Sequence, residues 1–108
     1  MKWKTRYSEP AKKDLKKLDN SVKLQVFKAV DRVSINPVSI FEGGYGMPLG
    51  NKGGRNLTGL LKIKLKHAGV RVIYKVEKRD REMVIIVIGI RADEEAYDIA
   101  ERRMKLYE

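Results

Sequence analysis

The chain has 108 residues, a formal net charge of +10 and no cysteine, which suits one domain, 1–108, and excludes disulfides and thiolate metal ligands. Its charged start lacks a signal-peptide pattern and its longest apolar run, 83–90, is too short to span a bilayer, so we expect a cytoplasmic protein with no membrane partner. The positive excess favours polyanions such as nucleic acid or an acidic protein segment, although charge alone does not exclude an anionic membrane surface.

The first third of the chain predicts one strand and two helices. Residues 2–7 alternate between basic and less polar side chains, which is the period of a half-buried strand. Residues 8–19 then favour a short, basic helix. From residue 21 the apolar positions recur at helical spacing until the Asn-Pro pair at 36–37 ends the pattern. We expect the two helices to form a hairpin.

A glycine-rich segment follows. Residues 36–56 contain six of the nine glycines and two of the three prolines. This density of turn formers favours an ordered or partly mobile surface loop over a regular element. No GK[ST] triplet follows the glycines, so a phosphate-binding P-loop is not expected. The loop either borders a binding channel or merely connects its neighbours.

Three strands are predicted next, over 57–66, 70–77 and 82–90, with tight turns between them. The third is apolar on both faces and is therefore expected to be central in the sheet. A final helix begins with an acidic turn at Asp93 and ends with basic residues, which complements the helix dipole. The order β-α-α-β-β-β-α predicts an α+β fold, with a mainly antiparallel four-stranded sheet, a helical hairpin and a C-terminal helix.

The hairpin of the first two of these strands places basic side chains on one face. A tight turn at 66–69 sets Lys64 opposite Arg71. Lys62 then shares this face from a position opposite Ile73, while the other face collects apolar residues. A slip of one residue would turn the lysines of one strand toward the core, so this register is strongly preferred. We expect these three cations to face solvent together.

A solvated outer face is the ordinary explanation for alternating lysines. Residues 57–75, however, contain no acid, so their like charges repel one another unless an anion compensates them. This favours a surface that binds a polyanion.

Other chemistries have few candidate residues. One histidine and no cysteine disfavour a zinc site, and no cofactor is expected. His67 lies in a predicted turn and is better explained as a solvated residue than as a catalytic base. Trp3 and Tyr97 are core aromatics unless they flank the cationic residues, where they would stack on bases.

Three parts of the chain together resemble a known family. They read YSEPAKKDLKKLD near the N-terminus, PLGNKGGRNLTGLLKIKLKHAGVRVIYKV in the middle and IGIRADEEAYDIAERR near the C-terminus. The combination resembles the RelE-type toxins of type II toxin-antitoxin modules, within the RelE/ParE superfamily. This resemblance implies a microbial-RNase-like fold and cleavage of messenger RNA in the ribosomal A site. It also implies a cognate antitoxin that forms a hetero-oligomer with the toxin, and we expect an acidic antitoxin segment to cover the basic residues.

The resemblance further implies a set of cleavage residues. The matching positions are Lys62, Lys64, Arg71, Arg91 and Tyr97. In this set Lys62 and Arg71 would contact the phosphate, and Lys64 would accept the proton of the attacking 2′-hydroxyl. Arg91, whose orientation the sequence does not give, would support the leaving oxygen, and Tyr97 would stack on the nucleotide. The ParE branch, which poisons DNA gyrase, generally lacks the full set, and a non-enzymatic gyrase inhibitor is the alternative.

Overall fold

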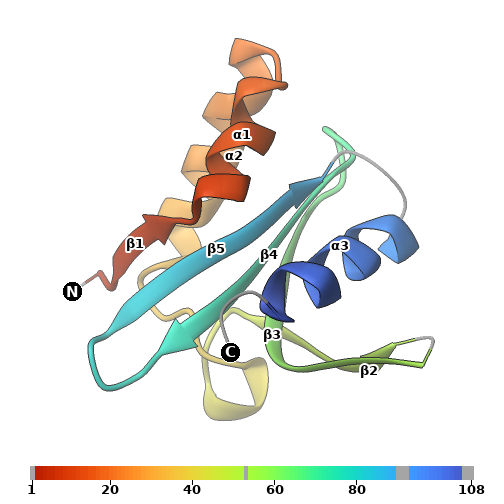
Figure 1. Cartoon of the computed structure of the whole chain (residues 1–108). Helices are drawn as coiled ribbons and strands as arrows, with labels where there is room; N and C mark the ends of the chain where they lie inside the picture. The colour runs from red at the N-terminus through yellow and green to blue at the C-terminus, as the bar shows by residue number, and fades with distance from the viewer. Residues whose placement is uncertain (1, 53, 90–92, 106–108) are drawn as a thin grey trace.

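The computed structural model describes residues 2–52, 54–89 and 93–105, within which three α-helices, one 3-10 helix and five strands form (Figure 1). In chain order they are β1 Lys4–Tyr7, α1 Glu9–Lys16, α2 Asn20–Val33, η1 Ile40–Glu42, β2 Met47–Lys52, β3 Arg55–Leu65, β4 Val70–Glu77, β5 Glu82–Gly89 and α3 Asp93–Lys105. The predicted α+β class and helical hairpin are confirmed. None of the helices in this part of the chain has the length and hydrophobicity that crossing a membrane requires.

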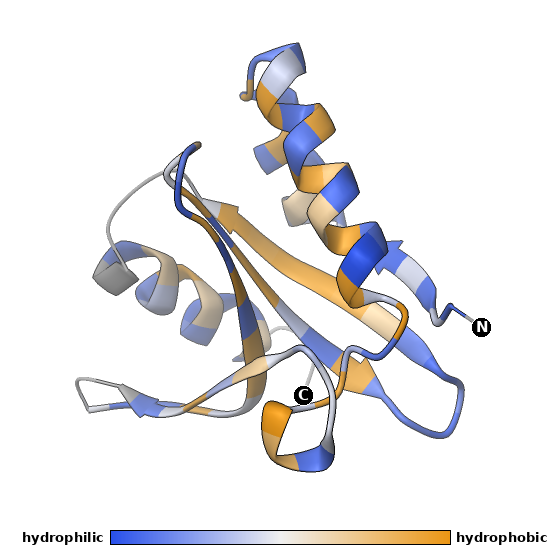
Figure 2. Cartoon of the chain, turned by 180° about the vertical axis from the view of Figure 1, so that it is seen from behind, coloured by the Kyte–Doolittle hydropathy of each residue, from blue (hydrophilic) through white to orange (hydrophobic). Residues whose placement is uncertain are grey.

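The five strands of the described residues form one sheet in the order β1-β5-β4-β3-β2. β1 runs parallel to β5, and the other neighbouring strands are antiparallel. The predicted number of four strands was therefore one too low. β5 was expected to be central. It is an interior strand, second in the order, with β1 on one side and β4 on the other. It is hydrophobic along most of its length because helices cover both faces of the sheet (Figure 2).

The fifth strand, β2, comes from the segment 36–56 that the sequence predicts to be a loop. β2 pairs with the N-terminal part of β3 at the edge of the sheet, and its register shifts between Pro48 and Gly50. An edge strand with a bulge tolerates proline and glycine, because it needs hydrogen bonds on one side only. The loop prediction was wrong for this part, because the turn-forming residues hid an irregular strand.

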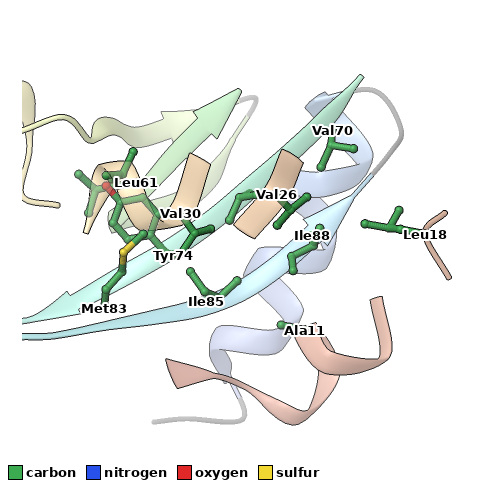
Figure 3. Packing of buried hydrophobic residues seen from close by; sticks show 12 residues of the cluster. Ala11, Leu18, Val26, Val30, Leu61, Val70, Tyr74, Met83, Ile85 and Ile88 are labelled. Carbon is green, nitrogen blue, oxygen red and sulfur yellow. The ribbon is translucent and has the colours of Figure 1, made fainter. Parts of the chain in front are cut away.

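Two hydrophobic clusters fill the two sides of the sheet. The first packs α1 and α2 against the sheet (Figure 3). It includes the fully buried Tyr74, whose hydroxyl donates to the Pro37 carbonyl oxygen at 2.8 Å. The second packs α3 against the opposite face through Ala96, Tyr97 and Ala100. The face that carries the predicted cations is therefore also the face that α3 covers.

Side chains from two helices complete the edge of β5. β1 pairs with β5 only as far as Ile85. Beyond that point the Ile88 amide donates to Asp14 Oδ2 at 3.0 Å, and Arg103 Nη1 donates to the Ile86 carbonyl oxygen at 2.8 Å. Arg103 also donates to both carboxylate oxygens of Asp14, at 2.7 and 3.1 Å. This pair ties α1 to α3 and so fixes α3 over the sheet.

Candidate functional site

The hairpin of β3 and β4 has the predicted register. Lys64 lies opposite Arg71, and Lys62 lies opposite Ile73. Leu61 and the other alternate residues of β3 point into the first hydrophobic cluster. Because alternate residues of a strand share a face, Lys62, Lys64 and Arg71 lie on the same face of the sheet.

Lys62 is not the solvent-facing residue that the sequence predicts. Its side chain is half-buried, because α3 packs over this part of the sheet. Lys62 Nζ donates to the Tyr97 hydroxyl at 2.9 Å and lies 5.6 Å from the centre of the Tyr97 ring. The expectation that the three cations face solvent together is therefore fully met only by Lys64, since Arg71 is half-buried as well. The Lys62 neighbours Leu60 and Ile73 are buried on the same face and require a cover.

Tyr97 lies in the second hydrophobic cluster, with only 6% of its surface exposed. Its ring packs against the sheet, and its hydroxyl accepts the hydrogen bond from Lys62. Stacking of this ring on a nucleotide is not available in the observed arrangement. Instead, the Tyr97 hydroxyl holds the Lys62 ammonium by a hydrogen bond and so orients the Lys62 side chain.

The remaining predicted residues differ in exposure. Lys64 is exposed, and Arg71 is half-buried, with its Nη1 donating to the Gly69 carbonyl oxygen at 3.3 Å. Directly opposite residues have Cβ atoms about 5 Å apart, so both side chains can reach one anion. Arg91 lies outside the described residues. The structure thus brings together Lys62, Lys64, Arg71 and Tyr97.

Acidic residues from outside the basic segment neutralise part of its charge. Lys75 Nζ lies 2.8 Å from Glu77 Oε1, and the hydrogen bond from Lys75 holds the pKa of Glu77 below its ordinary value. Nearby, Arg55 binds Asp98 of α3 and lowers the pKa of that carboxyl in the same way. At Lys75, the anion that compensates the charge of residues 57–75 is therefore a carboxylate of the protein itself.

The sequence analysis missed two cations of α2. Lys28 and Arg32 line a pocket together with Lys64 and His67. Their spacing of four residues places them on one face of the helix. Only the packing of α2 beside β3 brings that face to Lys64, so no sequence pattern would have identified the group.

The cluster can bind an anion and stabilise negative charge on it. A lysine ammonium has three donors, and Tyr97 takes one from Lys62, which leaves two for a ligand. Cations held on a rigid sheet are well placed to stabilise charge on phosphoryl oxygens. In the described part of the chain, no three His, Asp or Glu side chains gather as metal ligands would.

The chain is similar to known proteins in sequence. The family model of the ParE toxin of the type II toxin-antitoxin system, parDE, matches residues 5–97. A RelE-like toxin protein of Escherichia coli is 26% identical over 105 residues, which cover 97% of this chain and 100% of the relative.

The chain is also similar to solved structures. A mutant of the E. coli toxin RelE in the free state has a TM-score of 0.73 at 25% identity, and the match covers 96% of this chain and 99% of that chain. A chain of the intact E. coli RelBE toxin-antitoxin complex has a TM-score of 0.63 at 26% identity, with 83% of this chain and 98% of that chain covered.

Proposed function

The chain belongs to the ParE toxin family of type II toxin-antitoxin systems, and on that premise we propose that it is a RelE-like endoribonuclease that cleaves messenger RNA on the ribosome. The observation that supports this most is the cluster of Lys62, Lys64, Arg71 and Tyr97 around one face of the sheet. These are positions at which the resemblance to RelE-type toxins implies cleavage residues. Cleaved messages would stop translation and so account for toxicity.

The proposed reaction starts with in-line attack of a 2′-hydroxyl on the adjacent phosphate. The new bond joins the 2′-oxygen to phosphorus, and the bond from phosphorus to the 5′-oxygen breaks. Negative charge grows on the phosphoryl oxygens, where Lys62 and Arg71 would bind. Because Tyr97 already orients Lys62, this cation needs little reorganisation when the transition state forms.

The other residues take the remaining roles. Lys64 is exposed beside Arg71 and is the candidate to accept the proton of the 2′-hydroxyl, a role that only its unprotonated amine can take. Arg91 would stabilise the leaving 5′-oxygen through its charge, a role carried over from the resemblance alone. Tyr97 would position Lys62 rather than stack on the nucleotide, because its ring is buried.

The ribosome is the proposed source of substrate orientation. In the described residues, the candidate site contains lysines, an arginine and a tyrosine but no pair of histidine and carboxylate for general acid-base catalysis. Such a site depends strongly on a correctly held substrate. We expect slow cleavage of naked RNA and fast cleavage of message bound in the ribosomal A site.

A cognate antitoxin is the proposed regulator, in a hetero-oligomer with this chain. The net charge of +10 favours an acidic antitoxin segment, which would reach the basic surface quickly and in a salt-dependent way. The similarity to a chain of the RelBE toxin-antitoxin complex supports such a partner.

The second candidate is a non-enzymatic toxin that inhibits DNA gyrase. It is favoured by the match to the ParE family model. Cleavage is preferred because the chain carries residues that the gyrase-directed branch generally lacks. RNA 5′ ends mapped after induction of the protein, together with plasmid supercoiling, separate the two: new 5′ ends within coding regions support cleavage, whereas altered supercoiling without new ends supports gyrase inhibition.

The candidate residues can be tested one at a time. Lys62→Ala, Lys64→Ala and Arg71→Ala should each lower the rate of ribosome-dependent cleavage by about 10²- to 10³-fold, which is the usual effect of losing one preorganised charge or one proton acceptor. The measurement is the cleavage rate of a defined message on programmed ribosomes, with the melting temperature of each variant recorded in parallel.

Two control variants make the result specific. Lys13→Ala removes an exposed lysine from α1 and should change neither the rate nor the stability. Val72→Ala leaves a cavity in the first cluster and should lower the melting temperature, with cleavage per folded molecule preserved. Near-normal cleavage by folded Lys62→Ala, Lys64→Ala and Arg71→Ala proteins would show that the catalytic assignment is wrong.

A further inference from the structure

A groove between α2 and the end of β3 gathers basic side chains next to the candidate site. We call it the α2–β3 groove. Lys28 and Arg32 line it from α2, and Lys64 and His67 line it from the end of β3 and the turn that follows. Its volume is about 300 Å³, and its floor is apolar, with Val33 among the floor residues. Among the described residues, no carboxylate lines it.

None of these four side chains has a hydrogen-bond or ion-pair partner within the residues that the structure describes. Some surface cations elsewhere do find acids, as Lys2 does with Asp31 at 2.8 Å. Asp31 is the acid nearest to the groove along α2, and that contact with Lys2 already engages both of its oxygens. The groove therefore gathers positive charge with no carboxylate among the described residues that line it, which costs free energy unless an anion binds.

The groove is continuous with the candidate site through Lys64. β2 covers the outer edge of β3 only as far as Met47 opposite Lys62, so the edge of 63–65 has no strand partner among the described strands. Lys64 lies opposite Arg71 on the face of the candidate site and also lines the groove. Lys64 thus belongs both to the candidate site and to the lining of the groove, at an open edge of the sheet.

We infer that the α2–β3 groove binds the phosphodiester backbone of RNA next to the nucleotide that is cleaved. The inference rests on the proposed function, because the proposed function supplies RNA as the ligand. Grooves that bind single-stranded nucleic acid track its backbone with a positively charged lining. Lys28 and Arg32 lie one helical turn apart along the groove, so each can contact a different phosphate. Continuity with the candidate phosphate site favours RNA over an acidic peptide as the occupant.

The RNA could be the message itself or ribosomal RNA, and both present the same phosphodiester chemistry. The test compares Lys28→Ala/Arg32→Ala with Lys13→Ala/Lys16→Ala. Each pair of substitutions removes two exposed lysines or arginines from a helix, and the second pair lies on α1 and does not line the groove. The melting temperatures should match that of the parent protein, since alanine favours helix at these exposed positions.

The probes are a short single-stranded oligonucleotide, 2′-O-methylated at every position, and vacant ribosomes. The methylated strand has no 2′-hydroxyl to attack its phosphates, so binding is measured without cleavage. For single strands, each lost phosphate contact makes the negative slope of log K against log salt shallower by ~0.7. The slope of the groove variant should therefore be shallower than that of the α1 control variant by about 1.4, because two contacts are lost.

The outcomes separate the two sources. A reduced slope with the oligonucleotide assigns the groove to the message, and a reduction with ribosomes alone assigns it to ribosomal RNA. Equal slopes for the groove and control variants on both probes overturn the inference, as does weakened antitoxin binding with RNA binding intact. If the parent protein binds RNA through the groove but never cleaves it, the proposed function is refuted, whereas the inference that the groove binds RNA is supported.

Discussion

At the scale of single residues, the contact between Lys62 and Tyr97 governs the candidate site. An exposed lysine has a flexible stem that loses conformational entropy when it binds a ligand. Here the Tyr97 hydroxyl accepts from Lys62 Nζ at 2.9 Å, and the buried ring holds that hydroxyl in place. Lys62 is therefore ordered before any substrate arrives, and the loss of this order should lower the rate rather than the affinity.

Tyr97→Phe removes the hydroxyl and keeps the ring. We expect the cleavage rate constant kcat to fall between about 10- and 100-fold with little change in KM, because Lys62 loses its orientation. Stability should fall by only about 1 kcal/mol, which is typical of one lost hydrogen bond. Rates over a range of message concentrations and denaturant unfolding check the two effects.

Tyr74→Phe is the matched control for that prediction. It also removes a buried tyrosine hydroxyl, the one that donates to the Pro37 carbonyl oxygen at 2.8 Å, but it does so in the cluster on the opposite face of the sheet. Its stability should fall similarly, with kcat preserved. Equal kcat values for the Tyr97→Phe and Tyr74→Phe proteins would contradict the positioning role of Tyr97.

At the scale of elements, the pair of Asp14 and Arg103 decides where α3 lies. Their side chains are only 13% and 19% exposed and replace a strand at the end of β5. Because they join α1 to α3, they also set the position of Tyr97 over Lys62. A buried ion pair is costly to break by removing one partner, since the other is left without compensation.

Arg103→Met should therefore destabilise the protein by roughly 2 kcal/mol, less than a fully buried pair would because some exposure remains. Lys12→Ala breaks the exposed pair of Lys12 and Glu9 and should cost less than about 0.5 kcal/mol. Urea unfolding of both variants measures the difference. Equal midpoints for the two would show that the Asp14 pair does not hold the fold together.

The elements also show what the sequence could predict. The register of β3 with β4 followed from alternation, since a slip would have buried lysines. The strand β2 was hidden by its glycines and proline, and the α2–β3 groove depends on tertiary packing that no local pattern encodes. The sequence did contain a signal that a helix packs over Lys62. β5 is apolar on both faces, so each face of the sheet needs a helix.

At the scale of the whole molecule, ionisable groups limit stability on the acid side. Three carboxyls have a pKa below the ordinary value because a cation donates to each. They are Glu42 with Lys78, Glu77 with Lys75, and Asp98 with Arg55. Their contribution is present above the ordinary values of 4.5 and 3.8 and is lost as pH falls through the lowered ones. Protonation there also adds to a net charge that is already +10.

On the alkaline side, burial raises the pKa of Tyr74 above its ordinary value of 10.0. The unfolded chain then loses the proton first, so the contribution of Tyr74 is complete below pH 10.0 and declines as pH rises toward the folded pKa. We expect the free energy of unfolding to fall above about pH 10 and to fall less steeply in Tyr74→Phe. Urea midpoints across this range test the prediction, which an unchanged alkaline slope would contradict. The pKa of Tyr7 is also raised by burial, so Tyr7 adds to the slope in both proteins.

β1 pairs with a strand that the ribosome makes much later. Lys4 lies opposite Glu82, so most of the chain must be translated before β1 meets its neighbour in the sheet. Closing so long a loop carries an entropic cost that delays this part of folding. The Tyr97 hydroxyl that holds Lys62 arrives later still, on α3. Under the proposed function, a chain that is still being translated does not yet have the assembled site with which to attack the message that encodes it.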